Sequence, residues 1–143
     1  MSATETGGLW PRLMQRWCMM PQGQTPMTVL LVDDDPLVLS VLAEALTECG
    51  HRVVPCRDAG ECLAALDGAG ERLLLVTDMA LPGCSGRALA EEVRRRRPGV
   101  PVVFATGLPA SAVVPLGTDE TLMEKPFSLR DFAAVVARLV TVA

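Results

Sequence analysis

The chain has 143 residues, of which 50% are hydrophobic and 21% are charged, which fits one compact domain and excludes a wholly disordered protein. Its 17 acidic and 13 basic residues give a net charge of −4, which argues against a surface built to bind nucleic acid. No apolar run approaches the ~20 residues of a membrane span, and the N-terminus lacks the apolar core of a signal peptide. We therefore expect a cytoplasmic protein with no nucleic-acid partner and no membrane span.

Residues 1–26 differ in composition from the rest of the chain, because they contain both Trp and a Gly/Gln/Thr-rich stretch bounded by Pro. We expect an N-terminal extension and linker over 1–26 and one domain over 27–143. Four apolar residues of the extension recur at helical spacing: Leu9, Leu13, Trp17 and Met20. They indicate either a short helix that docks on a partner or membrane surface or a frayed extension. We favour the frayed extension because so short a helix is marginal alone.

The first predicted strand is Val29–Val32, an apolar run that indicates burial on both faces of a sheet. Three acidic residues follow it, and the last of them, Asp35, is a good helix N-cap with Pro36 at the first helical position. Apolar residues at helical spacing then predict a helix that ends at Gly50.

A second strand is predicted over Arg52–Cys56, and we expect His51, in the turn before it, to be exposed with a structural role. Asp58 and Glu61 have the spacing of a capping box and predict a helix that ends at Gly68.

The third predicted strand, Leu73–Thr77, delivers Asp78 at its end. A loop over Met79–Gly86 leads into a helix that Pro98 terminates. The arginine run Arg94–Arg97 at the end of this helix is expected to be a solvated helix end rather than a nucleic-acid patch, because cations suit the last turn of a helix.

A fourth strand is predicted over Val100–Ala105 and closes on Thr106. Prolines in the segment Leu108–Gly117 leave room for only a shortened fourth helix. A weak fifth strand, Thr121–Glu124, ends at Lys125, and Ser128 then caps a last helix.

Five strands that alternate with helical segments predict an α/β fold with a doubly wound, five-stranded parallel sheet, because each return to a parallel neighbour needs a crossover of about a dozen residues. In such folds ligands bind outside the carboxyl ends of the strands. The residues predicted at those ends are Asp33, Asp34, Asp78, Thr106 and Lys125. Three carboxylates close together either raise a pKa or bind a hard cation, and oxygen ligands at an incomplete site suit Mg²⁺.

Four motifs stand in this order along the chain: VLLVDDDP, LLLVTDMALPG, VVFATG and EKPF. From Met27 to its end the sequence resembles the receiver domain of bacterial two-component response regulators. The resemblance implies a flavodoxin-like fold with strand order 2-1-3-4-5 and a bound Mg²⁺. It also implies a role for each residue at the site. Asp78 is the phosphoacceptor, Asp33 and Asp34 bind the metal with Asp78 and the backbone carbonyl of Ala80, Thr106 and Lys125 engage the phosphoryl group, and Pro126 follows a cis peptide bond.

The sequence departs from the family pattern at several positions. Leu122 stands three residues before the Lys, where the family usually has an aromatic switch residue. The shortened fourth helix belongs to the face that the family uses for partners and dimers. Ala80 and Leu108 offer no side-chain hydrogen bond to an attacking water, so we expect slow self-dephosphorylation.

We expect a single-domain response regulator, not an enzyme, that accepts a phosphoryl group on Asp78 and signals by protein contact. Its expected partners are a sensor histidine kinase or phosphotransfer protein and a downstream protein target, and a homodimer is a further form of contact. Two alternatives stay open: a phosphorylation-independent receiver-like interaction module, and a small Mg²⁺-dependent phosphohydrolase or nucleotide-binding domain. The second is weaker because no Gly-rich phosphate loop follows the first strand.

Overall fold

A computed structural model of the chain describes residues 27–107, 117 and 119–142. The predicted N-terminal extension and the shortened fourth helix lie outside the described residues. None of the described helices is long and apolar enough to cross a membrane.

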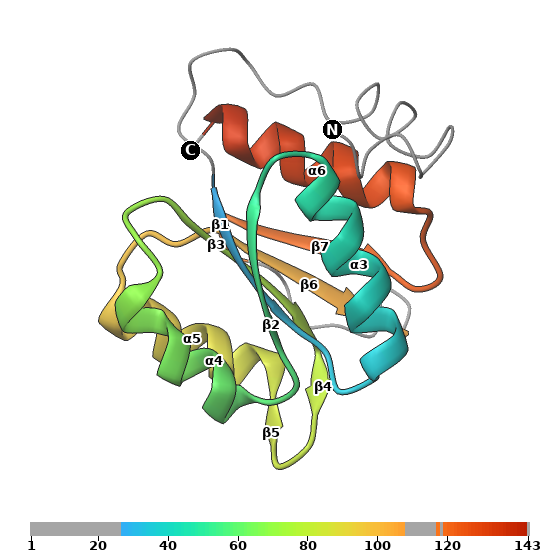
Figure 1. Cartoon of the computed structure of the whole chain (residues 1–143). Helices are drawn as coiled ribbons and strands as arrows, with labels where there is room; N and C mark the ends of the chain where they lie inside the picture. The colour runs from blue at the N-terminus through green and yellow to red at the C-terminus, as the bar shows by residue number, and fades with distance from the viewer. Residues whose placement is uncertain (1–26, 108–116, 118, 143) are drawn as a thin grey trace.

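A five-stranded sheet forms the centre of the molecule (Figure 1). Its strands are β1 (Thr28–Val32), β2 (Arg52–Cys56), β3 (Leu73–Asp78), β6 (Val102–Thr106) and β7 (Glu120–Glu124). They lie in the order β2-β1-β3-β6-β7, and each pair of neighbours is parallel. The α/β class and the strand order 2-1-3-4-5 are therefore confirmed, since β6 and β7 are the fourth and fifth strands of the predicted sheet.

Helices cover both faces of this sheet (Figure 1). On one face, α3 (Pro36–Glu48) and α6 (Leu129–Val142) pack on buried strand residues such as Leu31 and Val103. On the other face, α4 (Ala59–Ala65), the short 3₁₀ helix η1 (Leu66–Gly68) and α5 (Gly86–Arg96) pack on residues such as Phe104. Successive strand residues point to opposite faces, so the apolar runs seen in the sequence are buried from both sides.

The helix starts follow the predicted capping residues. The Asp35 carboxylate accepts a hydrogen bond from the Leu37 N–H at 3.0 Å. The Ser128 hydroxyl accepts one from the Asp131 N–H at 3.0 Å, and this places the start of α6. Each cap satisfies a backbone N–H that has no partner within its own helix. The capping residues therefore fix where the chain turns away from the carboxyl edge of the sheet.

The predicted loop over 79–86 contains a small β-hairpin that the sequence analysis does not predict. Strands β4 (Ala80–Leu81) and β5 (Cys84–Ser85) pair antiparallel across a turn in which Gly83 has a φ of 74°. Two-residue strands are too short to show any apolar alternation, and glycine adopts positive φ without strain. The hairpin ties the segment after Asp78 to the start of α5.

The expectation that His51 is exposed is wrong, because only 6% of its surface is accessible. The chain folds back after α3, and the His51 N–H donates to the Leu46 carbonyl at 3.2 Å, which holds the backbone of His51 close to the end of the helix. Its Nδ1 is buried and has no hydrogen-bond partner among the described residues. Burial lowers the pKa of His51 below its ordinary value of 6.5, and the charge of Arg72 adds to this effect.

This buried histidine predicts a loss of stability in mild acid. Because the unfolded chain takes up a proton near pH 6.5 and the folded chain only at lower pH, the free energy of unfolding should fall as the pH drops below 6.5. The slope should approach ~1.4 kcal/mol per pH unit, the limit for one proton. Urea unfolding across this range should show the decline in the wild type and a flatter curve in His51→Leu. Equal slopes in the two proteins would contradict it.

Candidate functional site

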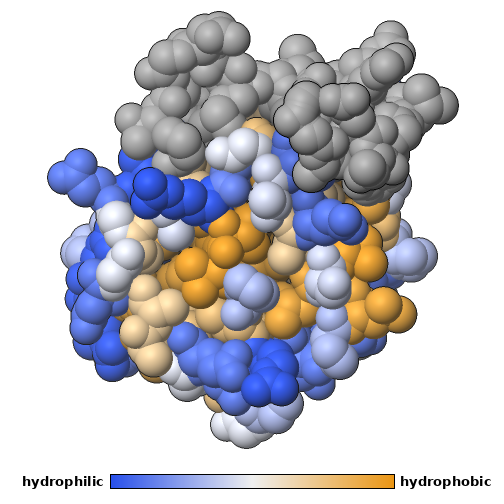
Figure 2. Space-filling view, in the orientation of Figure 1, coloured by the Kyte–Doolittle hydropathy of each residue, from blue (hydrophilic) through white to orange (hydrophobic). Residues whose placement is uncertain are grey.

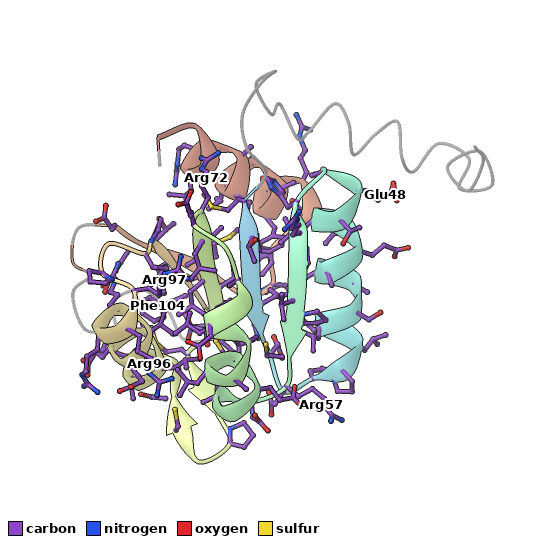
Figure 3. The ribbon with its side chains drawn as sticks, turned by 60° about the vertical axis from the view of Figure 1, so that its left-hand side comes forward. Glu48, Arg57, Arg72, Arg96, Arg97 and Phe104 are labelled. Atoms are coloured by element: carbon purple, nitrogen blue, oxygen red, sulfur yellow. The ribbon has the colours of Figure 1, made fainter. Side chains whose placement is uncertain are left out.

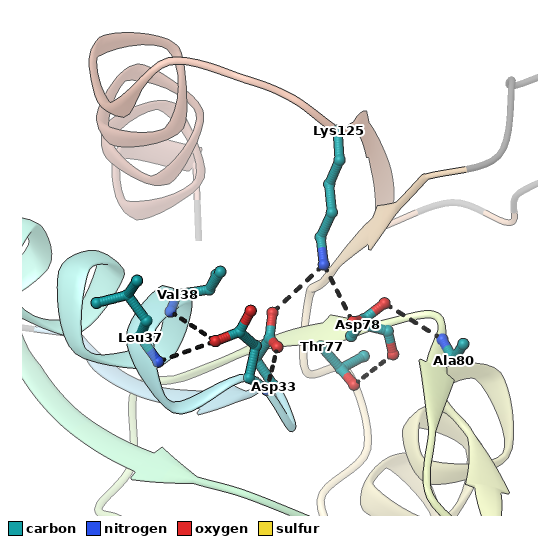
Figure 4. A network of polar contacts seen from close by, with 8 residues as sticks. Asp33, Leu37, Val38, Thr77, Asp78, Ala80 and Lys125 are labelled. Atoms are coloured by element: carbon teal, nitrogen blue, oxygen red, sulfur yellow. Dashed lines mark hydrogen bonds and ion pairs between the residues drawn. The ribbon is translucent and has the colours of Figure 1, made fainter.

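The candidate site lies at the carboxyl edge of the sheet, where the ends of parallel strands meet. Asp33 follows β1, Asp78 ends β3 and Lys125 follows β7. Figure 4 shows the Lys125 ammonium between the two carboxylates, with Nζ 3.0 Å from Asp78 Oδ2 and 3.4 Å from Asp33 Oδ2. Parallel pairing of the strands thus brings together side chains that are far apart in the sequence.

The structure brings Asp33, Asp34 and Asp78 into one cluster. One carboxylate oxygen from each residue lies within 4.8 Å of the other two. Asp33 is buried, Asp78 is half-buried and Asp34 is exposed, so the cluster opens to solvent on one side. With Lys125 as the ammonium that bridges Asp33 and Asp78, three carboxylates leave an excess of negative charge. Such an oxygen-only cluster fits a divalent hard cation, and Mg²⁺ suits a site with few protein ligands.

Burial and neighbouring charges raise the pKa values of Asp33 and Lys125. Burial raises the pKa of the Asp33 carboxyl and the charge of Asp78 adds to the rise, against the lowering effects of the Asp35 N–H and Lys125. Burial alone would lower the pKa of Lys125, but its hydrogen bond to Asp78 and the charges of Asp33 and Asp78 raise it overall. Lys125 is therefore charged at neutral pH, and a divalent cation would favour the ionised form of Asp33.

Three hydrogen bonds restrain Asp78 and its neighbours, and Figure 4 shows the two that Thr77 and Ala80 make with Asp78. The Met79 N–H donates to the Ala105 carbonyl of the neighbouring strand at 2.8 Å. The Thr77 hydroxyl donates to the Asp78 carbonyl at 2.9 Å, and the Ala80 N–H reaches Asp78 Oδ1 at 3.3 Å. Because both the backbone and the carboxylate are restrained, the Asp78 side chain is aimed at the cluster.

Thr106 and Pro126 lie where the sequence places them. Thr106 ends β6 and is buried, and the residue before it, Ala105, is in register with Asp78. The Thr106 carbonyl accepts a hydrogen bond from the Lys125 N–H at 2.7 Å, so the main chains of these two residues are directly linked. The Lys125–Pro126 peptide bond is cis, as predicted.

Comparison with known proteins decides the family. Residues 29–137 match the response regulator receiver domain. The chain belongs to this family. It is 36% identical over 109 residues to the transcriptional regulatory protein TcrA of Mycobacterium tuberculosis. The aligned region covers 74% of this chain and 43% of TcrA. The chain spans less than half the length of the curated relatives it matches.

Solved structures agree with the family assignment. A CheY-like receiver domain protein from Methanospirillum hungatei JF-1 has a TM-score of 0.71 and 26% identity, over 82% of this chain and 96% of the other. The response regulator TrrA from Thermotoga maritima, solved in complex with Mg²⁺-BeF, has a TM-score of 0.68 and 26% identity, over 79% of this chain and 98% of the other.

Leu122 lies next to a contact between Phe104 and Arg87. Leu122 is in register with Phe104 on the next strand and packs against the same apolar cluster. The Arg87 guanidinium from α5 lies 5.1 Å from the centre of the Phe104 ring and also pairs with Glu120 at 3.5 Å. The Phe104 ring beside Leu122 therefore has the Arg87 cation within the distance of a cation–π interaction. Sequence reasoning missed Arg87 and Glu120 because they belong to no motif.

The arginine run at the end of α5 is only partly a solvated helix end. Arg95 and Arg96 pair with Glu92 on the surface, as expected of a helix terminus. Arg94 instead donates to Glu120 at 2.7 Å, and Arg97 donates to the carbonyl of Leu66 at 3.5 Å. Figure 3 shows Arg96 and Arg97 on the same side of the sheet as Phe104. Two of the four arginines therefore bind neighbouring parts of the domain.

An apolar groove of about 450 Å³ opens beside Lys125. It is lined by side chains of α3 and of the segment after β7, with Lys125 at the site itself: Leu37, Val38, Val41, Leu42, Lys125, Pro126, Phe127 and Leu129. Figure 2 shows apolar surface on α3 and over β2. Leu37 is 72% exposed and Val41 is 41% exposed, so α3 presents apolar side chains to solvent next to the acidic cluster.

Proposed function

We propose that this chain accepts a phosphoryl group on Asp78 from the phosphohistidine of a sensor histidine kinase or phosphotransfer protein, and signals through protein contact. The observation that carries the proposal is the position of the Asp78 carboxylate, which belongs to a candidate cation site and also contacts the Lys125 ammonium. This carboxylate shares the 4.8 Å cluster with Asp33 and Asp34 and lies 3.0 Å from the Lys125 ammonium. In this proposal the protein is a phosphoryl acceptor rather than an enzyme.

The proposed reaction forms a bond between an Asp78 oxygen and phosphorus while the bond from phosphorus to the partner's imidazole nitrogen breaks. The products are an acyl phosphate on Asp78 and a free imidazole on the partner. Mg²⁺ held by Asp33, Asp34, Asp78 and the carbonyl of Ala80 would neutralise charge on the transferring group. Lys125 binds the same group from the other side, and the buried Thr106 hydroxyl is the proposed hydrogen-bond donor to the phosphoryl once it is attached.

Intact-mass measurement with a small phosphodonor tests the proposal without the partner. Purified protein incubated with acetyl phosphate and Mg²⁺ should gain the mass of one phosphoryl group, and EDTA should prevent the gain. No gain under conditions that bind Mg²⁺ would instead favour a phosphorylation-independent interaction module. Turnover of the donor without a covalent species would favour a phosphohydrolase.

The acyl phosphate is expected to be long-lived. The methyl group of Ala80 cannot hydrogen-bond a water for attack on phosphorus, although its backbone N–H and carbonyl remain at the site. After removal of the donor, the mass of the phosphorylated wild type should persist for minutes or longer in Mg²⁺. Ala80→Asn restores a polar side chain and should shorten the lifetime. A wild-type half-life of seconds would contradict the expectation. The second residue of this prediction, Leu108, lies outside the described residues.

The groove beside Lys125 is the proposed contact for an apolar helix face of the phosphohistidine protein. Its position supports this, because Lys125 both lines the groove and contacts the Asp78 carboxylate, so a partner bound in the groove would lie next to the acceptor. The donor for this test is the kinase or phosphotransfer protein that phosphorylates the wild type fastest. Leu37→Glu should lower the rate of transfer from that donor by about tenfold or more, since a charge replaces an apolar anchor. Transfer from acetyl phosphate should not change.

Ser40→Glu is the matched control for this variant, because Ser40 is also exposed on α3 but does not line the groove. It should leave transfer from both donors unchanged. Equal slowing of the two variants would point to net charge on α3 rather than to the groove.

A further inference from the structure

The structure points to Gly86 as a positioning residue for Asp78, and we propose that its missing side chain is required to place the phosphoacceptor; this inference rests on the proposed function. A Cβ built on Gly86 would overlap the Asp78 carbonyl oxygen. It would also lie 3.1 Å from the Asp78 carbonyl carbon and 3.1 Å from Met79 Cα. All three are backbone atoms, so no side-chain rotation can relieve the overlap.

Gly86 is the first residue of α5, is buried, and lies against the backbone of Asp78 and Met79. Its N–H donates to the Met79 carbonyl at 2.7 Å, which holds the helix start against this segment. Its backbone does not have the positive φ that requires glycine at Gly83. The requirement at Gly86 is therefore space for a close approach of two main chains.

The atoms that Gly86 contacts belong to the segment that carries the chemistry. The carbonyl that a Cβ would overlap already accepts the Thr77 hydroxyl at 2.9 Å. The next residue, Met79, is anchored to Ala105, and the Ala80 N–H binds the Asp78 carboxylate. A displaced Asp78 carbonyl would thus move the nucleophilic carboxylate and the proposed carbonyl ligand of Ala80 together.

The helix side of this contact has little freedom to absorb the displacement. Leu89, Ala90 and Val93 of α5 are buried in the apolar cluster on this face of the sheet. Close-packed side chains of this kind resist sliding, so a methyl group at Gly86 should push the shorter segment at Asp78. A shift of about 1 Å in a reacting group can cost on the order of 10²-fold in rate.

The test compares Gly86→Ala with two controls in the full chain. Gly68→Ala adds the same methyl group in η1, where no atom lies within 4 Å of the new Cβ. Ser85→Ala removes the cap of α5, whose hydroxyl accepts from the Ala88 N–H at 3.0 Å, without placing an atom against Asp78. It therefore measures the effect of a loosened helix start alone.

Two quantities are measured for each protein: the rate of phosphorylation by acetyl phosphate at saturating Mg²⁺, and the Mg²⁺ affinity from calorimetry. Gly86→Ala should lower the rate by about 10²-fold and weaken Mg²⁺ binding, while both controls stay near wild type even if Ser85→Ala lowers Tm. A purely structural role of Gly86 would change Tm and leave both quantities in place, and that result would overturn the proposal.

Folding of Gly86→Ala is checked by circular dichroism in the cold, with trimethylamine N-oxide added to favour the folded state. Complete loss of the fold under those conditions would also overturn the proposal, because glycine would then be required for the whole domain. If the wild type gains no phosphoryl group, the proposed function fails separately. The Mg²⁺ affinities of Gly86→Ala and Gly68→Ala then still decide whether Gly86 places Asp78.

Discussion

Asp78→Asn should gain no phosphoryl group from acetyl phosphate or from a phosphohistidine partner. The amide has the shape of the carboxylate, but its oxygen carries no full negative charge and is a far weaker nucleophile. The hydrogen bonds from the Thr77 hydroxyl to the Asp78 carbonyl and from the Met79 N–H to the Ala105 carbonyl do not depend on the Asp78 side chain, so the fold should remain. Intact-mass measurement beside the wild type checks the result.

Asp35→Asn is the matched control for this variant. Asp35 also carries a carboxylate near the site, but its role is to cap α3, and asparagine caps helices equally well. Asp35→Asn should be phosphorylated like the wild type. A phosphoryl gain in Asp78→Asn equal to that of the wild type would show that another residue accepts the group.

Asp34→Asn should weaken Mg²⁺ binding by at least about tenfold, the low end of the cost of losing even an outer partner of a metal ligand. Asp34 contributes an oxygen to the 4.8 Å cluster and is exposed, so the substitution removes a charged ligand at little cost to stability. Calorimetric titration with Mg²⁺ measures the dissociation constant. The Mg²⁺ concentration that gives half the maximal phosphorylation rate should rise by a similar factor.

Asp35→Asn again provides the comparison, since it changes the net charge by the same amount and lies next to Asp34 in the chain. It should have nearly wild-type Mg²⁺ affinity. If both variants weaken binding equally, the general negative potential of the acidic run attracts the ion, and the assignment of Asp34 as a ligand is wrong.

The sequence predicts the meeting of Asp33, Asp78 and Lys125 because a simple geometric rule applies to them. Each follows or ends a predicted strand, and the carboxyl ends of parallel strands lie at one edge of the sheet. Lys125 therefore bridges carboxylates that are 47 and 92 residues away in the chain. The proposed reaction, by contrast, comes from the family motifs, since acidic clusters alone do not distinguish phosphoryl acceptance from metal binding.

The features that sequence analysis missed depend on distances between segments rather than on local pattern. A glycine after Ser85 is typical of many helix starts, and only the folded chain shows the Asp78 carbonyl against it. The burial of His51 depends on how the chain folds back after α3. The inward contact of Arg94 with Glu120 joins residues 26 positions apart on two elements. Periodicity carries no information on such contacts.

Reduction of the phosphorylated protein with borohydride tests the central claim most directly, because it converts an aspartyl phosphate to homoserine and so marks the acceptor residue. After incubation with acetyl phosphate and Mg²⁺, peptide mass spectrometry should find homoserine at position 78 and unmodified aspartate at positions 33 and 34. Homoserine at another acidic residue, or none at all in protein that had gained a phosphoryl group, would contradict the assignment of Asp78 as the acceptor.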